Sequence, residues 1–156
     1  MRKKSRYKPK GVRLDNLTYI TAGFKPVAEL GDIATDLRLK NHMAMTMLTQ
    51  GKAVKDDVNT IIALLNMMES MWRLGFGTEY KDVVSAGMKA MRAVGARGVE
   101  SGKFILKADE MAALNMAMEL HDAQLEVVTV RDMERAMDIV HDEIKHKRAT
   151  PIRTTA

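Results

Sequence analysis

The sequence predicts an all-α protein of about five helices arranged as an antiparallel helical bundle. Apolar residues recur every three or four positions along several long segments, which is the spacing of one helix face. β-Branched residues never alternate over a strand-length window, so no half-buried strand is predicted. The connections between the last four helical segments are short, which favours antiparallel neighbours. At 156 residues the chain has the length of one ordinary domain.

The first predicted helix begins at Asp32, a suitable N-cap, and ends near Gly51. Its apolar stripe comprises Ile33, Leu37, Ala44 and Leu48, and Met43, Met45 and Met47 add apolar surface beside that stripe.

The clearest helical pattern covers residues 57–74, with Asp56 or Asp57 as the cap. Its apolar face is formed by Val58, Ile61, Ile62, Leu65, Met68 and Trp72, and is widened by Leu64, Met67 and Met71. Because little polar surface remains, we expect this central helix to be buried on several sides.

Glycines interrupt the pattern twice after the central helix. In GFGTEY (75–80) two glycines flank Phe76, and Thr78 can cap a helix that carries Tyr80, Val83, Val84, Met88 and Met91. The stretch VGARGVESG (94–102) holds three glycines and little periodicity, so we interpret it as a loop. The following KFILK is expected to be a brief extended piece or a packed lead-in.

Two more helices are predicted toward the C-terminus. The first carries Met111, Leu114, Asn115, Met118 and Leu125 at helical spacing. Thr129 and Asp132 then match a capping box, with Asp in place of the usual Glu or Gln. The last helix has a narrow apolar stripe of Met133, Ala136, Met137, Val140 and Ile144.

The two ends of the chain differ from the helical body. We predict a basic flexible tail at 1–13, an irregular arm at 14–31, a helical bundle domain at 32–147 and a flexible C-terminal tail at 148–156. Gly23 and Pro26 break the pattern within the arm. The arm is expected to lie against the bundle or to reach a neighbouring subunit.

The net charge of +5 is unevenly distributed. Residues 1–13 carry seven Lys and Arg and residues 145–156 carry four more, both without acid, which leaves 14 basic against all 20 acidic residues between them. Any contact with nucleic-acid phosphates is therefore expected in the tails. The candidate nucleic-acid-binding residues are Arg2, Lys3, Lys4, Arg6, Tyr7, Lys8, Lys10 and Arg13, of which Tyr7 can stack on a base.

The absence of cysteine excludes a disulfide framework, a thiolate zinc site, an iron–sulfur cluster and a Cys nucleophile. It is typical of a reducing cytosol. No apolar run approaches the roughly 18 residues that would suggest a membrane span, and the charged start is not followed by the apolar segment of a signal peptide. We expect a cytoplasmic protein without membrane contact.

Histidine and glycine motifs do not predict an enzyme. Asp138 and His141 stand one turn apart on the last predicted helix, but the pair of Glu-x-x-His motifs of a helical di-iron site is missing. GARGVESGK is superficially similar to a phosphate loop, yet its glycine spacing differs and Phe104 stands where Ser or Thr is required. We expect no cofactor, no metal and no catalysis, and a metalloenzyme using Asp138 and His141 is the catalytic alternative.

Fourteen methionines are unusually many for this length. Met fills irregular gaps in cores and is also common on adaptable binding surfaces. Core packing is the first interpretation, because most of these residues lie on helical stripes. The competing interpretation is an exposed strip that binds a protein partner, formed by Met43, Met47, Met67 and Met71. Apolar helix faces outnumber what one thin bundle can bury, which favours a homo-oligomer, a dimer or larger.

The opening RKKSRYKPKGVRLDNLTYI, followed by a helical, Met-rich body, resembles the small basic accessory proteins encoded by tailed bacteriophages of proteobacteria. The resemblance covers the N-terminal third and includes no catalytic motif. It implies a role through binding a phage or host protein, or nucleic acid, in the cytoplasm of the host cell.

Two functional hypotheses follow. In the first, a non-enzymatic helical oligomer presents a Met-rich apolar face to a protein partner. In the second, basic tails clamp the phosphates of DNA or RNA around an acidic bundle. The second hypothesis predicts binding that weakens steeply with salt and is lost when residues 1–13 are removed.

Overall fold

The computed structural model describes residues 21–149. The regular structure in this range is helical, apart from two isolated β-bridges, so the all-α prediction is confirmed. Residues 21–23 are helical as well. The helices with complete bounds are η1 (Val27–Leu30), α2 (Asp32–Thr49), α3 (Lys55–Arg73), η2 (Thr78–Tyr80), α4 (Lys81–Ser101), α5 (Ala108–Val127) and α6 (Val130–Lys145), where η denotes a 3₁₀ helix.

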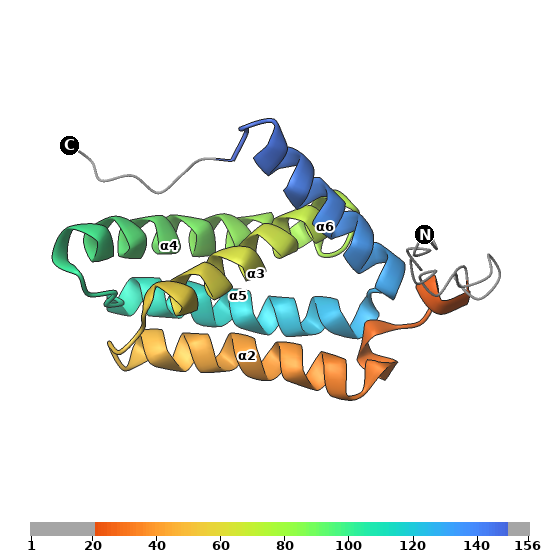
Figure 1. Cartoon of the computed structure of the whole chain (residues 1–156), viewed down its shortest axis with the longest axis horizontal. Coiled ribbons are helices and arrows are strands. Elements are labelled where there is room, and N and C mark those ends of the chain that lie inside the picture. The colour runs from red at the N-terminus through yellow and green to blue at the C-terminus, as the bar shows by residue number, and fades with distance from the viewer. Residues whose placement is uncertain (1–20, 150–156) are drawn as a thin grey trace, which may run out of the picture.

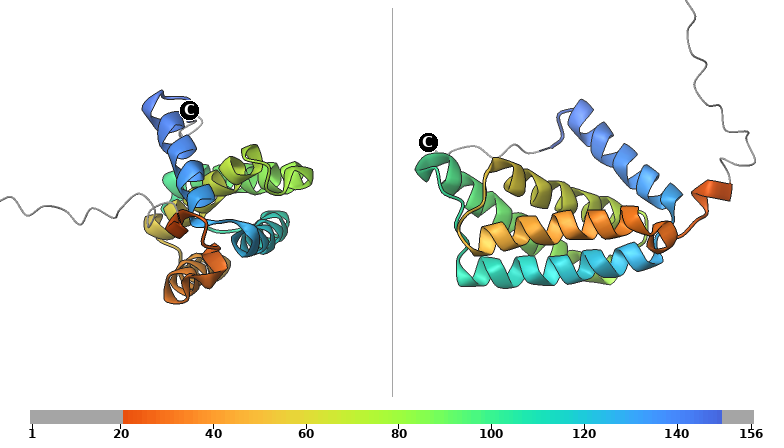
Figure 2. Two further views of the ribbon diagram at one scale, coloured as in Figure 1. Left: turned by 90° about the vertical axis from the view of Figure 1, so that its right-hand side faces the viewer. Right: turned by 60° about the horizontal axis from the view of Figure 1, so that its bottom comes forward.

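The four helices α2 to α5 lie side by side, and the chain reverses direction at each connection between them (Figure 1). Helix α3 packs against α2, α4, α5 and α6, which places the predicted central helix at the centre of the fold. Helix α6 leans away from the others toward its C-terminal end (Figure 2).

Two clusters of apolar side chains hold the helices together. The larger one is formed by buried residues of α2, α3, α4 and α5, including Leu48, Ile61 and Met91. The smaller one gathers Val27, Met71, Leu125, Val128 and Ala136 at the end of the bundle where α6 begins. Ala136 is the only residue of α6 that is buried, so the predicted stripe of α6 is covered only in part. Met137 and Ile144 are 47% and 58% exposed.

The prediction of a loop at residues 94–102 is wrong, because α4 continues to Ser101. Gly98 in this segment serves close packing instead of a turn. A Cβ on Gly98 would lie 2.0 Å from Cδ1 of Phe104, so the aromatic ring occupies the space that a side chain would need. Phe104 belongs to the KFILK segment, which is extended and pairs through an isolated bridge with Ala53. Only Gly102 ends the helix, in the left-handed conformation that favours glycine.

The capping box predicted before the last helix is present. The backbone N–H of Thr129 donates to the Asp132 carboxylate at 2.9 Å, and the Asp132 N–H donates to the Thr129 hydroxyl at 3.3 Å. The start of α2 differs from the prediction. Gly31 is the N-cap, Asp32 is the first helical residue, and Ile33 is 66% exposed instead of lying on the buried stripe.

The arm reaches the bundle through backbone hydrogen bonds to the α5–α6 connection. The Val27 N–H donates to the Val128 carbonyl at 3.0 Å, and the Val130 N–H donates to the Lys25 carbonyl at 2.9 Å. Val27 is buried in the smaller apolar cluster. The described part of the arm therefore closes one end of the core.

Candidate interaction surfaces

The candidate nucleic-acid-binding residues Arg2, Lys3, Lys4, Arg6, Tyr7, Lys8, Lys10 and Arg13 all lie outside the described residues. Of the basic C-terminal segment, Lys145, Lys147 and Arg148 are described, and all three are exposed at the end of α6.

The four methionines predicted to form one exposed strip do not share a surface. Met71 is fully buried in the smaller apolar cluster, so it cannot belong to the strip. Met67 packs against the same cluster and is half-buried. Met43 is 59% exposed and Met47 is half-buried, both on α2. The methionines of α3 are not exposed as predicted because that helix packs against four others, whereas α2 lies at the edge of the bundle.

The outer face of α2 nevertheless carries an apolar stripe. Leu39, Met43 and Met47 follow each other at four-residue spacing, and Leu39 is 57% exposed. The opposite face of α2 holds the buried Ala44 and Leu48. We call the three outer residues the α2 stripe. It contains two of the predicted partner-binding residues, Met43 and Met47.

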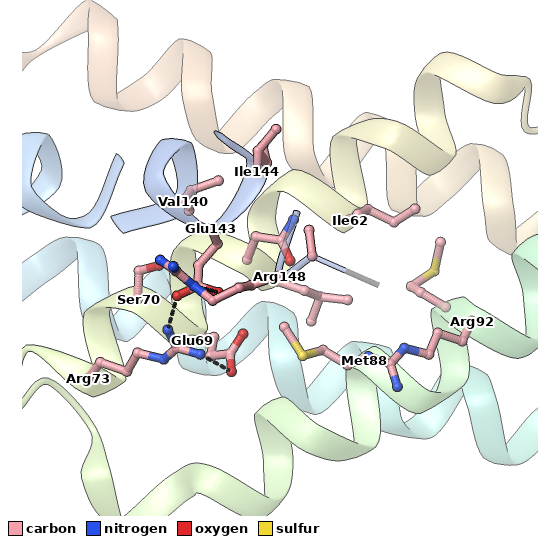
Figure 3. A pocket seen from close by; sticks show the side chains of 14 residues that line it. Ile62, Glu69, Ser70, Arg73, Met88, Arg92, Val140, Glu143, Ile144 and Arg148 are labelled. Atoms are coloured by element: carbon pink, nitrogen blue, oxygen red, sulfur yellow. Dashed lines mark hydrogen bonds and ion pairs between the residues drawn. The ribbon is translucent and has the colours of Figure 1, made fainter. Parts of the chain in front are cut away.

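A groove separates the C-terminal half of α6 from α3 and α4 (Figure 3). Its volume is about 310 Å³. The apolar part of its lining includes Ile62, Met88, Val140 and Ile144. This groove exists because α6 contacts α3 near one end and diverges from it toward the other (Figure 2). The diverging angle is a tertiary property that no local sequence pattern specifies.

A network of ion pairs closes one end of this groove. Arg73 donates to Glu69 at 3.0 Å and to Glu143 at 3.2 Å, and Arg148 donates through Nε to Glu143 at 3.2 Å. Hydrogen bonds from Arg148 and then Arg73 hold the pKa of the half-buried Glu143 below its ordinary value. Arg148 also pairs with Asp142. The network links Glu143 of α6 to Arg73 at the end of α3.

The backbone turn after α6 places Arg148 in this network. Lys147 adopts a left-handed conformation with φ of 56°. The Lys147 N–H donates to the Ile144 carbonyl and the Arg148 N–H to the Glu143 carbonyl, at 3.1 and 2.9 Å. These two bonds form a Schellman motif, in which the left-handed position is usually a glycine.

Arg92 lines the groove from α4 and differs from the other two arginines there. Within residues 21–149 it makes no hydrogen bond and no ion pair. Its guanidinium lies beside the apolar side chains of the lining, as Figure 3 shows for Arg92 and Met88. The groove therefore combines apolar walls with an uncompensated positive charge.

A buried histidine lies between α2 and α5. His121 is 2% exposed, and its Nδ1 has no hydrogen-bond partner among the described residues. Burial lowers its pKa from 6.5 to about 4, so the ring is neutral at pH 7. Beside it, His42 Nε2 lies 2.8 Å from the Asp122 carboxylate, and Arg38 pairs with Glu126. These polar pairs link α2 to α5 across the surface.

An ion pair that was not predicted from the sequence links α4 to α5. Arg97 donates to both carboxylate oxygens of Glu110, at 2.7 and 2.5 Å. The hydrogen bonds from Arg97 lower the pKa of Glu110, which also accepts the N–H of Lys107. Glu110 is buried although it is charged. The one feature in the sequence that points to it is its position three residues after the N-cap, where Glu is common in a capping box.

Within residues 21–149, no group of three or more His, Asp and Glu side chains could hold a metal ion. Asp138 and His141 are both exposed on α6. No helix in this range is long and apolar enough to span a bilayer. Comparison with protein-family models, curated proteins and solved structures found no match to the chain.

Proposed function

We propose that this protein is a non-enzymatic accessory or regulatory protein, of the type that tailed bacteriophages encode, and that it binds a protein partner through the α2 stripe. The helical body holds the stripe on a rigid support, and the polar residues on either side of it resemble the rim of an interface.

The single observation that carries this proposal is the exposure of Leu39 and Met43, at 57% and 59%, one turn apart on α2. Scattered apolar residues are normal on protein surfaces, whereas contiguous ones are typical of interaction sites. Met43 and Met47 have flexible, polarizable side chains, which suit a surface that adapts to its partner.

Site-specific photo-crosslinking tests the proposal. A photoreactive amino acid replaces Met43 in bacterial cells that produce the protein, and a matched sample carries it at the exposed Glu100 of α4. We expect one protein to crosslink at position 43 and not at position 100, and its purified form to bind the wild type but not Met43→Lys. Identical crosslinks at both positions, or equal binding of Met43→Lys, contradict the proposal.

The alternative is a nucleic-acid-associated protein whose tails clamp phosphates. It is supported by the seven Lys and Arg in residues 1–13 and by the exposed Lys145, Lys147 and Arg148. The test compares full-length protein with residues 14–156 on a DNA oligomer at low and physiological salt. Binding that depends on residues 1–13 and weakens steeply with salt favours this alternative. Binding that is unchanged by truncation excludes it.

A further inference from the structure

The groove between α3, α4 and α6 has more positive than negative charge. Its lining contains three arginines and two glutamates, and both glutamates are already paired, with Arg73 and Arg148. Arg92 is left without an acidic partner in the described part of the chain. Lys89 is exposed one turn before Arg92 on α4. An occupant of the groove therefore needs apolar side chains together with a carboxylate.

Helix α5 has the complementary composition. It contains five acidic residues and no Lys or Arg. Glu110, Asp122 and Glu126 are paired with residues of the same chain. Glu119 is exposed and has no hydrogen bond or ion pair within residues 21–149.

Around Glu119, the exposed surface of α5 carries apolar residues together with the polar Asn115 and Glu126. Met116 and Val127 are 57% and 65% exposed, and Ala123 is exposed between them. Met116 and Ala123 are seven residues apart and Val127 follows four residues later, so all three lie along one side of the helix. Glu119 lies one turn after Met116 on the same side. We call these four residues the α5 face.

We propose that the α5 face of a second copy of this chain docks in the groove, where Glu119 pairs with Arg92. The proposed pair joins a carboxylate and a guanidinium that both lack a partner within residues 21–149 and that both have apolar side chains beside them. An apolar occupant without an acid would bury the Arg92 charge unpaired, which is strongly unfavourable. The charge pair thus favours the α5 face over an apolar surface that lacks an acid.

The contact between the copies is head-to-tail. Helix α6, which forms one wall of the groove, rises from one side of the bundle, and α5 borders a different side (Figure 2). Each copy then offers a groove to one neighbour and an α5 face to another. Such a heterologous contact forms a closed ring if the rotation closes, and an open chain if it does not.

Analytical ultracentrifugation of charge-reversed variants tests this contact. Arg92→Glu and Glu119→Lys should each raise the dissociation constant of self-association at least about tenfold, because each places like charges together. The double variant, with both reversals in one chain, should restore association. Lys40→Glu and Glu100→Lys are the matched controls, since they reverse exposed charges outside the contact. Thermal unfolding of every variant verifies that the fold is retained.

Three results overturn the proposal: a wild type that is monomeric up to its solubility limit, single reversals that associate like the wild type, and a double reversal that does not recover. The last result indicates a different occupant of the groove, such as another protein. Mixing the two single variants gives a further check. The two single variants should associate again when mixed, because each groove then meets an α5 face of opposite charge on the other variant. Met43→Lys should leave self-association unchanged, so this proposal and the proposed function fail independently.

Discussion

Replacement of Gly98 by alanine tests how α4 packs against the segment that follows it. An added Cβ would lie 2.0 and 2.1 Å from two carbons of the Phe104 ring. Carbon atoms in contact are about 3.5–4.0 Å apart, so the ring must move by roughly 1.5 Å. Phe104 cannot move freely, because it packs on the larger apolar cluster and its backbone pairs with Ala53.

Two opposing effects determine how much Gly98→Ala changes the free energy of unfolding. Overpacking of this size costs about 1–3 kcal/mol, and partial exposure of an aromatic ring adds to the cost. Alanine in a helix gains about 1 kcal/mol over glycine. We therefore expect Gly98→Ala to lower the free energy of unfolding by about 1–2 kcal/mol. Urea denaturation followed by circular dichroism measures this difference directly.

The effect of Gly98→Ala on the free energy of unfolding should change sign when Phe104 is absent. In a Phe104→Ala background the clash is gone, so Gly98→Ala should stabilise by up to about 1 kcal/mol through helix propensity alone. The four proteins form a double-mutant cycle, and Gly87→Ala is a milder comparison because its Cβ meets a flexible end of Leu65 at 2.8 Å. If Gly98→Ala stabilises both backgrounds equally, Phe104 does not cover Gly98 and the packing argument is refuted.

Three further outcomes are expected. The folded-state pKa of His121, about 4, lies below the unfolded value of 6.5. The neutral buried ring therefore contributes fully to the free energy of unfolding above pH 6.5, and this contribution is lost as the pH falls toward 4. Urea titrations between pH 7 and 4 should show a loss of up to about 3 kcal/mol that His121→Gln lacks. Lys147→Gly should raise the unfolding free energy by about 0.5–1 kcal/mol in thermal unfolding, because glycine adopts a left-handed φ without strain; a loss of stability contradicts the motif. Arg97→Met should lower it by about 2 kcal/mol, less than for a fully buried pair because Arg97 is 35% exposed, and adding Glu110→Gln should restore most of the loss.

The helices could be predicted where a local pattern determines them. In α3 the run from Val58 to Met71 shows apolar residues at helical spacing, and Thr129 with Asp132 forms a cap within four residues. The segment 94–102 could not be predicted in this way. A glycine that ends a helix and a glycine that admits an aromatic ring look identical in sequence, and Phe104 lies outside the helix that contains Gly98.

The interaction surfaces were harder to predict than the helices. In the run from Met43 to Met47, every position except Thr46 is apolar, so the sequence does not say which side of the helix faces the core. Contacts with α3 and α5 decide that Met45 is buried and Met43 exposed. The groove depends on the angle of α6, and Arg92 becomes notable only because residues 21–149 provide it with no partner. His121 gives no signal at all in the sequence, since its burial depends on α2.

The hydrogen bonds between the arm and the α5–α6 connection have a consequence for synthesis. Val27 pairs with Val128, which the ribosome adds about a hundred residues later. At about 5–20 residues per second, roughly 5–20 s pass between these two events. During that interval the apolar side chains of the arm lack their cover, and Leu125 and Ala136 of the smaller cluster do not yet exist. Slow translation lengthens this exposure, so the nascent chain is most open to aggregation or to capture by a chaperone before α6 emerges.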